Sequence, residues 1–158
     1  MKRIKKGFLV LFLVSMGLIT NKVRVLTFEQ LETASHKNND TLYVVNFWAT
    51  WCRPCVLELP YFLESAKKNA NQKVKIVFVS LNSLKEIETV QKFTDTRNII
   101  QDVFILNAGN PNVWLDKIDK SWEGSIPATV MYKNNKKVFF REGEFTQTEI
   151  DSIINFKK

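Results

Sequence analysis

The sequence predicts an α/β domain in which helices cover both faces of a central mixed β-sheet. Two observations favour this class. Short apolar runs typical of buried strands alternate with stretches of helical periodicity along most of the chain. The last two strand-like runs are joined by a turn without an intervening helix, so part of the sheet is expected to be antiparallel. With 158 residues, the chain is long enough for one such domain.

The first predicted elements are a strand, a helix and a second strand. A short strand is predicted at 23–26. Thr27 and Gln30 then have the form of a capping box, which starts a helix that ends near Ser35. The run 41–48 is almost entirely apolar, as expected for a central strand that is covered on both faces.

A long helix and a second strand–helix pair are expected next. Apolar side chains recur at helical spacing from Val56 to Ala66, and Pro60 lies inside this pattern. Because proline cannot donate the helical hydrogen bond, we expect a kink or a break there. A strand is predicted at 73–81 and a helix at 84–95.

The C-terminal part is predicted to contain a short strand, a helical turn, a β-hairpin and a last helix. A polar turn at 133–136 joins the two hairpin strands. Thr146 and Glu149 have the spacing of a second capping box, which starts the last helix. The strands and the helical turn are predicted at 103–106, 113–118, 128–132 and 137–141.

The first 20 residues have the layout of a secretory signal, with four positive charges before the uncharged, mostly apolar run 7–20. This run is shorter than a typical membrane span. It contains no small-x-small cleavage site, so a cleaved signal and a short retained anchor both stay open. We therefore expect residues 1–20 to direct export and residues 21–158 to form the domain.

The formal charge argues against nucleic acid as a partner. The net charge is +7, but four positive charges lie in the first six residues, which leaves +3 for the rest of the chain. The remaining Lys and Arg are scattered among Asp and Glu, as on a solvated protein surface.

Cys52 and Cys55 are the only cysteines, and they lie between a predicted buried strand and a predicted helix. The first thiol is thus placed at a helix N-terminus, where free N–H groups and the helix dipole favour the reactive thiolate. Arg53 adds a positive charge beside it. The second sulfur is near enough to attack a mixed disulfide made by the first. We therefore interpret Cys52 as the nucleophile and Cys55 as the resolving thiol.

Other uses of two cysteines fit less well. A structural zinc site needs about four ligands, and the chain offers two Cys and the single His36. A purely structural disulfide usually closes a longer loop, because a short loop removes little entropy from the unfolded chain. We expect no metal and no organic cofactor, only the redox-active Cys52–Cys55 pair.

The segment 47–55, Phe-Trp-Ala-Thr-Trp-Cys-Arg-Pro-Cys, resembles the active site of the thioredoxin family. The continuation Val-Leu-Glu-Leu-Pro is similar to that of the exported TlpA/ResA-like reductases. The resemblance covers the chain after residue 20 and implies a thioredoxin fold. It also implies that Trp51, just before the pair, and Arg53 and Pro54, between the two cysteines, contact the substrate.

One position departs from cytoplasmic thioredoxin, in which a buried aspartate six residues before the first cysteine handles protons. This chain has Asn46 there, and an amide does not take a proton at working pH. The resemblance gives the role to Glu58, three residues beyond Cys55 on the same helix. A half-buried carboxyl there would have a raised pKa and could exchange the proton. The alternative is a surface glutamate near the start of a helix.

A second element resembles the family in the segment 125–129, Ser-Ile-Pro-Ala-Thr. The resemblance implies a cis peptide before Pro127, facing the cysteines, with the backbone of Ile126 presented to an extended substrate. The alternative is an ordinary trans proline that begins an edge strand. The long connection 107–122 is a candidate wall of a substrate groove.

These observations predict a monomeric thiol:disulfide oxidoreductase outside the cytoplasm. It would reduce disulfides of exported proteins and be reduced again by a thiol donor in the membrane. An oxidase that forms disulfides at the same site stays open, as does a copper-binding or partner-binding module. A peroxidase is disfavoured because Ala49 stands where that class has Thr or Ser.

Overall fold

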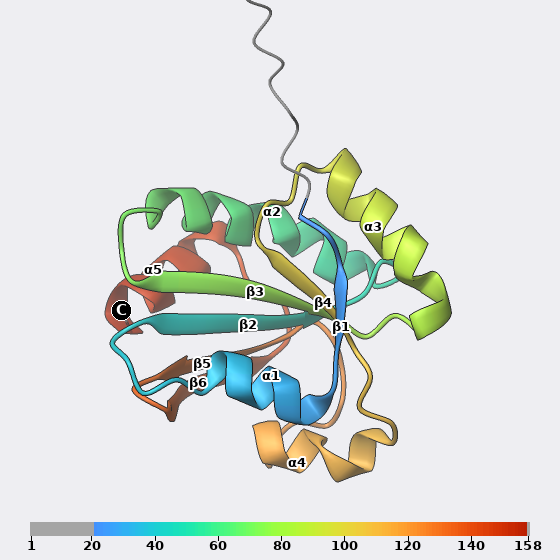
Figure 1. The fold of residues 1–158 in the computed structure, drawn as a ribbon. Coiled ribbons are helices and arrows are strands. Elements are labelled where there is room, and N and C mark those ends of the chain that lie inside the picture. The colour runs from blue at the N-terminus through green and yellow to red at the C-terminus, as the bar shows by residue number, and fades with distance from the viewer. Residues whose placement is uncertain (1–20, 158) are drawn as a thin grey trace, which may run out of the picture.

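The computed structural model describes residues 21–157 (Figure 1), so the predicted signal or anchor at 1–20 lies outside the described residues. Among residues 21–157, no helix combines the length and apolar character that crossing a membrane requires. In chain order the elements are β1 (Arg24–Leu26), α1 (Phe28–Ser35), β2 (Leu42–Trp48), α2 (Arg53–Lys68), β3 (Val74–Ser80), a 3₁₀ turn (Leu84–Glu86), α3 (Ile87–Thr96), β4 (Asp102–Leu106), a second 3₁₀ turn (Pro111–Val113), α4 (Leu115–Ile118), β5 (Ala128–Lys133), β6 (Lys136–Glu142) and α5 (Gln147–Lys157).

The described strands form one six-stranded sheet in the order β1-β4-β3-β2-β5-β6. β1, β4, β3 and β2 run parallel to one another, whereas β5 is antiparallel to both β2 and β6. All residues of β2 are buried, as expected for a strand with neighbours on both sides and helices on both faces. The predicted mixed sheet and the predicted central strand are both confirmed.

Helices cover the two faces of the sheet, with α2, α3 and α5 on one side and α1 and α4 on the other (Figure 1). The side chains of β2 alternate between these layers, because successive strand residues point to opposite faces. Val44 and Trp48 pack in the α2 layer, and Val45 and Phe47 pack in the α1 layer. The strand therefore divides the protein into two apolar cores.

Of the two outcomes expected at Pro60, the break is wrong, because α2 runs without interruption from Arg53 to Lys68. The kink stays a prediction. Pro60 is exposed on the outer face of the helix, while Leu59 and Phe62 beside it are buried against the sheet. Tertiary packing supplies most of the stability of helices in proteins. Here the buried face holds the helix together across the hydrogen bond that proline cannot make.

The local signals near the chain turns are confirmed. Asn134 and Asn135 form a two-residue hairpin turn with φ of 51° and 59°, values that asparagine tolerates better than most residues. Thr27 caps α1 together with Gln30. The N–H of Thr146 donates to the Glu149 carboxylate at 2.8 Å at the start of α5.

We expect Phe62→Ala to destabilise the protein by about 3–5 kcal/mol, the usual cost of removing a large buried aromatic side chain. Phe62 is fully buried and packs edge-on against Phe78 and Phe145. Phe156→Ala is the control, since that ring is 78% exposed and its loss should change the free energy of unfolding by about 0.5 kcal/mol or less. Urea denaturation measures both, and equal effects would contradict the described core.

Candidate active site

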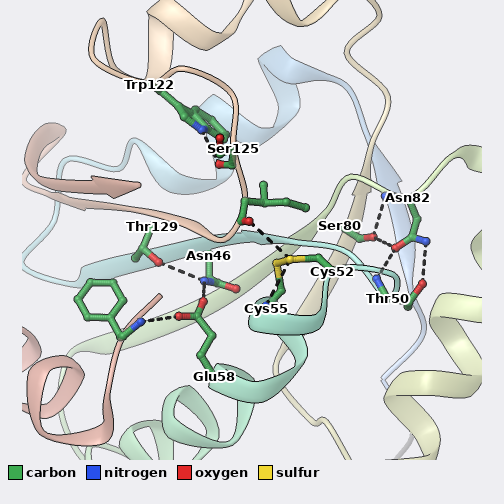
Figure 2. Close-up of a disulfide and its surroundings, with 12 residues drawn as sticks. Asn46, Thr50, Cys52, Cys55, Glu58, Ser80, Asn82, Trp122, Ser125 and Thr129 are labelled. Carbon is green, nitrogen blue, oxygen red and sulfur yellow. Dashed lines mark hydrogen bonds between the residues drawn. A yellow bond between two sulfur atoms is a disulfide. The ribbon is translucent and has the colours of Figure 1, made fainter. Parts of the chain in front are cut away.

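The two cysteines lie where the central strand meets the long helix. Cys52 is the N-cap of α2, and the N–H of Cys55 donates to its sulfur at 3.3 Å. The connecting segment is held by Asn82, which follows β3. Its side chain accepts the N–H of Thr50 at 3.0 Å and donates to the Thr50 hydroxyl at 2.8 Å (Figure 2). The start of α2 is therefore attached to two neighbouring strands of the sheet.

Cys52 and Cys55 form a disulfide, with their Cα atoms 5.3 Å apart. Cys52 is 6% exposed, whereas Cys55 is fully buried. An attacking or departing sulfur must approach along the S–S axis, so access decides which sulfur exchanges first. The exposure supports Cys52 as the sulfur that meets the substrate.

The loop before β5 faces the disulfide. The Ile126–Pro127 peptide is cis, as the resemblance to the thioredoxin family implied, so the alternative of a trans proline is wrong. The carbonyl oxygen of Ile126 lies 3.6 Å from the sulfur of Cys52. This loop and the N-terminus of α2 form the two sides of the site, although they are more than 70 residues apart in sequence.

Glu58 lies on the inner face of α2 and is only 1% exposed, which rules out the alternative of a surface glutamate and exceeds the half-burial that was expected. One carboxylate oxygen accepts the side-chain N–H of Asn46 at 2.8 Å, and the other accepts the backbone N–H of Phe145 at 2.8 Å. Asn46 also donates to the hydroxyl of Thr129 at 3.1 Å. The carboxyl group is thus fixed by residues from two strands and from the turn before α5.

Burial raises the pKa of Glu58 from 4.5 to about 7. The main cause is the loss of hydration of the charged form. The hydrogen bonds from Phe145 and Asn46 and the charge of Arg141 lower this pKa, and the charge of Glu144 raises it. Glu58 therefore gains and loses its proton near neutral pH, as a group that exchanges protons with thiols must do.

Asn46 has a larger part in the site than the sequence indicated. Figure 2 shows its amide between Glu58 and the disulfide, with the oxygen turned toward the sulfurs. Within residues 21–157 this buried oxygen has no hydrogen-bond partner. A polar residue inside an otherwise apolar strand was the signal that could have marked it. In the same way, the polar Asn82, two residues after the end of β3, could have marked the second anchor.

Of the residues that were predicted to contact substrate, Trp51, Arg53 and Pro54 adjoin Cys52 in the chain and Ile126 faces it, whereas Pro127 is buried. Trp51 is 63% exposed and Arg53 is exposed. Trp48 is fully buried and belongs to the core. The connection 107–122 contributes Asn107, Gly109 and Trp114 to a groove of about 310 Å³ at the ends of β3 and β4. Its role in substrate binding stays a prediction.

The described residues offer no evident metal centre. Within residues 21–157, no three His, Cys, Asp or Glu side chains lie together in a way that could hold a metal ion.

Comparison with known proteins gives a consistent picture. Residues 20–140 match the AhpC/TSA family. The chain is 40% identical over 114 residues to the thiol-disulfide oxidoreductase ResA of Oceanobacillus iheyensis, which covers 71% of this chain and 55% of that protein. It is 36% identical over 67 residues to the thioredoxin-like protein YneN of Bacillus subtilis, which covers 42% of this chain and 39% of that protein. The chain thus matches from about two fifths to just over half the length of these relatives.

Solved structures show the same fold. A thioredoxin family protein of Chlorobium tepidum, described as a thiol:disulfide interchange protein, has a TM-score of 0.62 at 23% identity, over 75% of this chain and 81% of that one. StoA of Bacillus subtilis has a TM-score of 0.57 at 20% identity, over 73% and 83% of the two chains. A secreted Mycobacterium tuberculosis disulfide oxidoreductase has a TM-score of 0.57 at 20% identity, over 75% and 84%. The predicted thioredoxin fold is confirmed.

We expect Glu58 to make the oxidised protein less stable as the pH rises from 4.5 to 7. In this window the unfolded chain has released the Glu58 proton while the folded chain still holds it, so folding binds a proton and is weakened by raising the pH. The contribution lost is about 3 kcal/mol, at roughly 1.36 kcal/mol for each pKa unit.

Urea denaturation between pH 4.5 and 8 checks this expectation against Glu58→Gln, which cannot titrate. The free energy of unfolding of the unaltered protein should fall relative to that of the variant across the window. Glu64→Gln, which changes an exposed glutamate on the same helix, should leave the difference intact. Parallel profiles for the unaltered protein and Glu58→Gln would contradict the raised pKa.

Proposed function

We propose that this chain, which belongs to the AhpC/TSA family, is a thiol:disulfide oxidoreductase that reduces disulfides of exported proteins. The observation that carries the proposal is the Cys52–Cys55 disulfide at the start of α2, with only Cys52 reaching the surface below the Ile126 carbonyl. The similarity to proteins named thiol-disulfide oxidoreductase supports the same chemistry.

In the proposed cycle the reduced protein acts first through the Cys52 thiolate. The N–H of Cys55 already points at this sulfur, and the free N–H groups at a helix start stabilise a negative sulfur. The thiolate attacks one sulfur of the substrate disulfide, forms a mixed disulfide, and releases the other substrate sulfur as a thiolate that takes up a proton.

Cys55 then resolves the mixed disulfide. Its thiol loses a proton to Glu58, which is the only buried carboxyl group among residues 21–157. The Cys55 thiolate attacks the sulfur of Cys52, and the second substrate sulfur leaves and is protonated. The substrate gains two electrons and two protons, and the chain is left with the Cys52–Cys55 disulfide.

Return to the dithiol requires a second thiol compound, for which we propose a dithiol donor in the membrane. An extracytoplasmic setting fits the signal-like layout of residues 1–20. It also agrees with the description of one structural neighbour as secreted. The conformation of Trp51 and Arg53, both exposed beside Cys52, makes them available to either partner, and we propose that they contact the substrate together with Pro54, Ile126 and Pro127.

We expect Cys55→Ser to accumulate a mixed disulfide through Cys52 when the variant meets a protein disulfide such as insulin. Without the Cys55 sulfur, nothing within the chain attacks the mixed disulfide that Cys52 forms, so the adduct persists. Non-reducing gels and mass spectrometry measure the adduct. Cys52→Ser should form none and should lose turnover. If Cys52→Ser kept the function of the chain, a module that binds partners without redox chemistry would be the better description.

We expect the Cys52–Cys55 couple to have a reduction potential of about −220 mV or below, toward the reducing end of the thioredoxin-like range. Equilibration with glutathione or dithiothreitol at pH 7 measures it. A value near about −120 mV, as found for strong oxidants, would reverse the proposed direction and make the chain a disulfide-forming oxidase. The same residues would then carry the opposite reaction.

A further inference from the structure

Glu142, the last residue of β6, lies against the loop that faces the disulfide. One oxygen of its carboxylate accepts the backbone N–H of Ser125 at 2.6 Å, and the other accepts the backbone N–H of Glu123 at 3.0 Å. Gly124 between them has a φ of 97°, a conformation that side chains rarely adopt. This backbone turns both N–H groups toward the same carboxylate, as in the concave anion sites that successive N–H groups form in proteins.

Two further hydrogen bonds fix the same loop. The indole N–H of Trp122 donates to the carbonyl of Ser125 at 2.9 Å (Figure 2). The N–H of Gly143 donates to the carbonyl of Pro127 at 2.8 Å. Trp122 is buried against Phe47 in the α1 layer, so the loop is joined to the core on one side and to the end of β6 on the other.

Within the part of the loop that faces the disulfide, these contacts leave the backbone groups of Ile126 free. Its N–H makes no hydrogen bond with any residue of the range 21–157, and its carbonyl oxygen faces the sulfur of Cys52 at 3.6 Å. An extended peptide that pairs with this residue finds the donor and acceptor already in place. Pre-ordering of this kind lowers the entropy cost of binding.

We propose that Glu142 is a positioning residue for substrate binding: its carboxylate holds the loop 123–126 so that Ile126 presents its backbone to an extended, disulfide-containing peptide beside Cys52. The inference rests on the proposed function for the identity of the ligand. Both oxygens of the carboxylate are used by the loop, and hydrogen bonds to a charged acceptor are stronger than neutral ones. Within residues 21–157, no Lys or Arg forms an ion pair with Glu142, so the loop amides are its partners.

Glu142→Ala tests the proposal in the full chain, with Glu142→Gln as the conservative variant and Glu88→Ala, an exposed glutamate on α3, as the control. We expect Glu142→Ala to raise KM for insulin reduction about tenfold, the ratio that corresponds to about 1.4 kcal/mol, with kcat little changed. Glu142→Gln, which keeps one acceptor oxygen, should fall between Glu142→Ala and the unaltered protein. Glu88→Ala should match the unaltered protein.

Two readouts separate positioning from general damage. The rate at which dithiothreitol reduces Cys52–Cys55 and the reduction potential should stay the same in Glu142→Ala, because a small dithiol does not need the backbone of Ile126. A changed potential with an unchanged KM for insulin would overturn the proposal. So would a Glu142→Ala variant that equals the unaltered protein in all three measurements.

Amide hydrogen exchange, followed by NMR, tests the contact without any assay of activity. In the unaltered protein the amides of Glu123 and Ser125 should be protected, and in Glu142→Gln at least one of them should exchange faster. Unprotected amides in the unaltered protein would overturn the inference even where insulin is reduced. Protected amides in a protein that does not reduce insulin would leave the loop contact standing and refute the proposed function instead.

Discussion

The antiparallel pairing of β2 with β5 is the constraint on which the whole site depends. In this register Phe47 lies opposite Ala128 and Asn46 lies opposite Thr129. The cis peptide directly precedes β5, and Cys52 follows shortly after β2. Because these strands are antiparallel neighbours, the cis peptide and Cys52 lie beyond the same end of the strand pair. A slip of one residue would turn every side chain of β2 to the opposite face. Asn46 would then leave Glu58, and Trp48 would leave the α2 core.

That register also explains how the carboxyl group of Glu58, whose burial is energetically unfavourable, is kept inside the protein. A buried carboxylate is unfavourable unless it is protonated or receives hydrogen bonds. Glu58 receives two, one from Asn46 on β2 and one from Phe145, and its pKa still rises to about 7. Groups with perturbed pKa values concentrate at functional sites. Glu58 is thus buried at a cost in stability, as expected of a group that serves the chemistry proposed for this site.

Features that depend on residues close together in the sequence could be predicted, whereas contacts between distant residues required the structure. Strand and helix order, the capping boxes at Thr27 and Thr146, and the hairpin turn depend on neighbours in sequence, and they could be predicted. The break at Pro60 could not be decided locally, because the burial of Leu59 and Phe62 holds the helix together. Asn46, Asn82 and Glu142 each have partners 12 to 83 residues away in the site, and no spacing rule in the sequence reveals such contacts. The cysteines were found from their spacing between a predicted strand and a predicted helix, and Glu58 from the family resemblance and helical spacing. The contacts that orient them appeared only in three dimensions.

The unequal exposure of the two sulfurs limits which thiol compounds can exchange electrons with the Cys52–Cys55 pair. A couple whose second sulfur is sealed inside the protein exchanges only with molecules that can bring a sulfur onto Cys52. The reduction potential of the couple sets the direction of electron transfer after contact. The shape of the surface around Cys52 determines which molecules make that contact. Two pools of thiols at different potentials can then share one compartment without reaching equilibrium through this protein, because only molecules that fit around Cys52 exchange electrons with it.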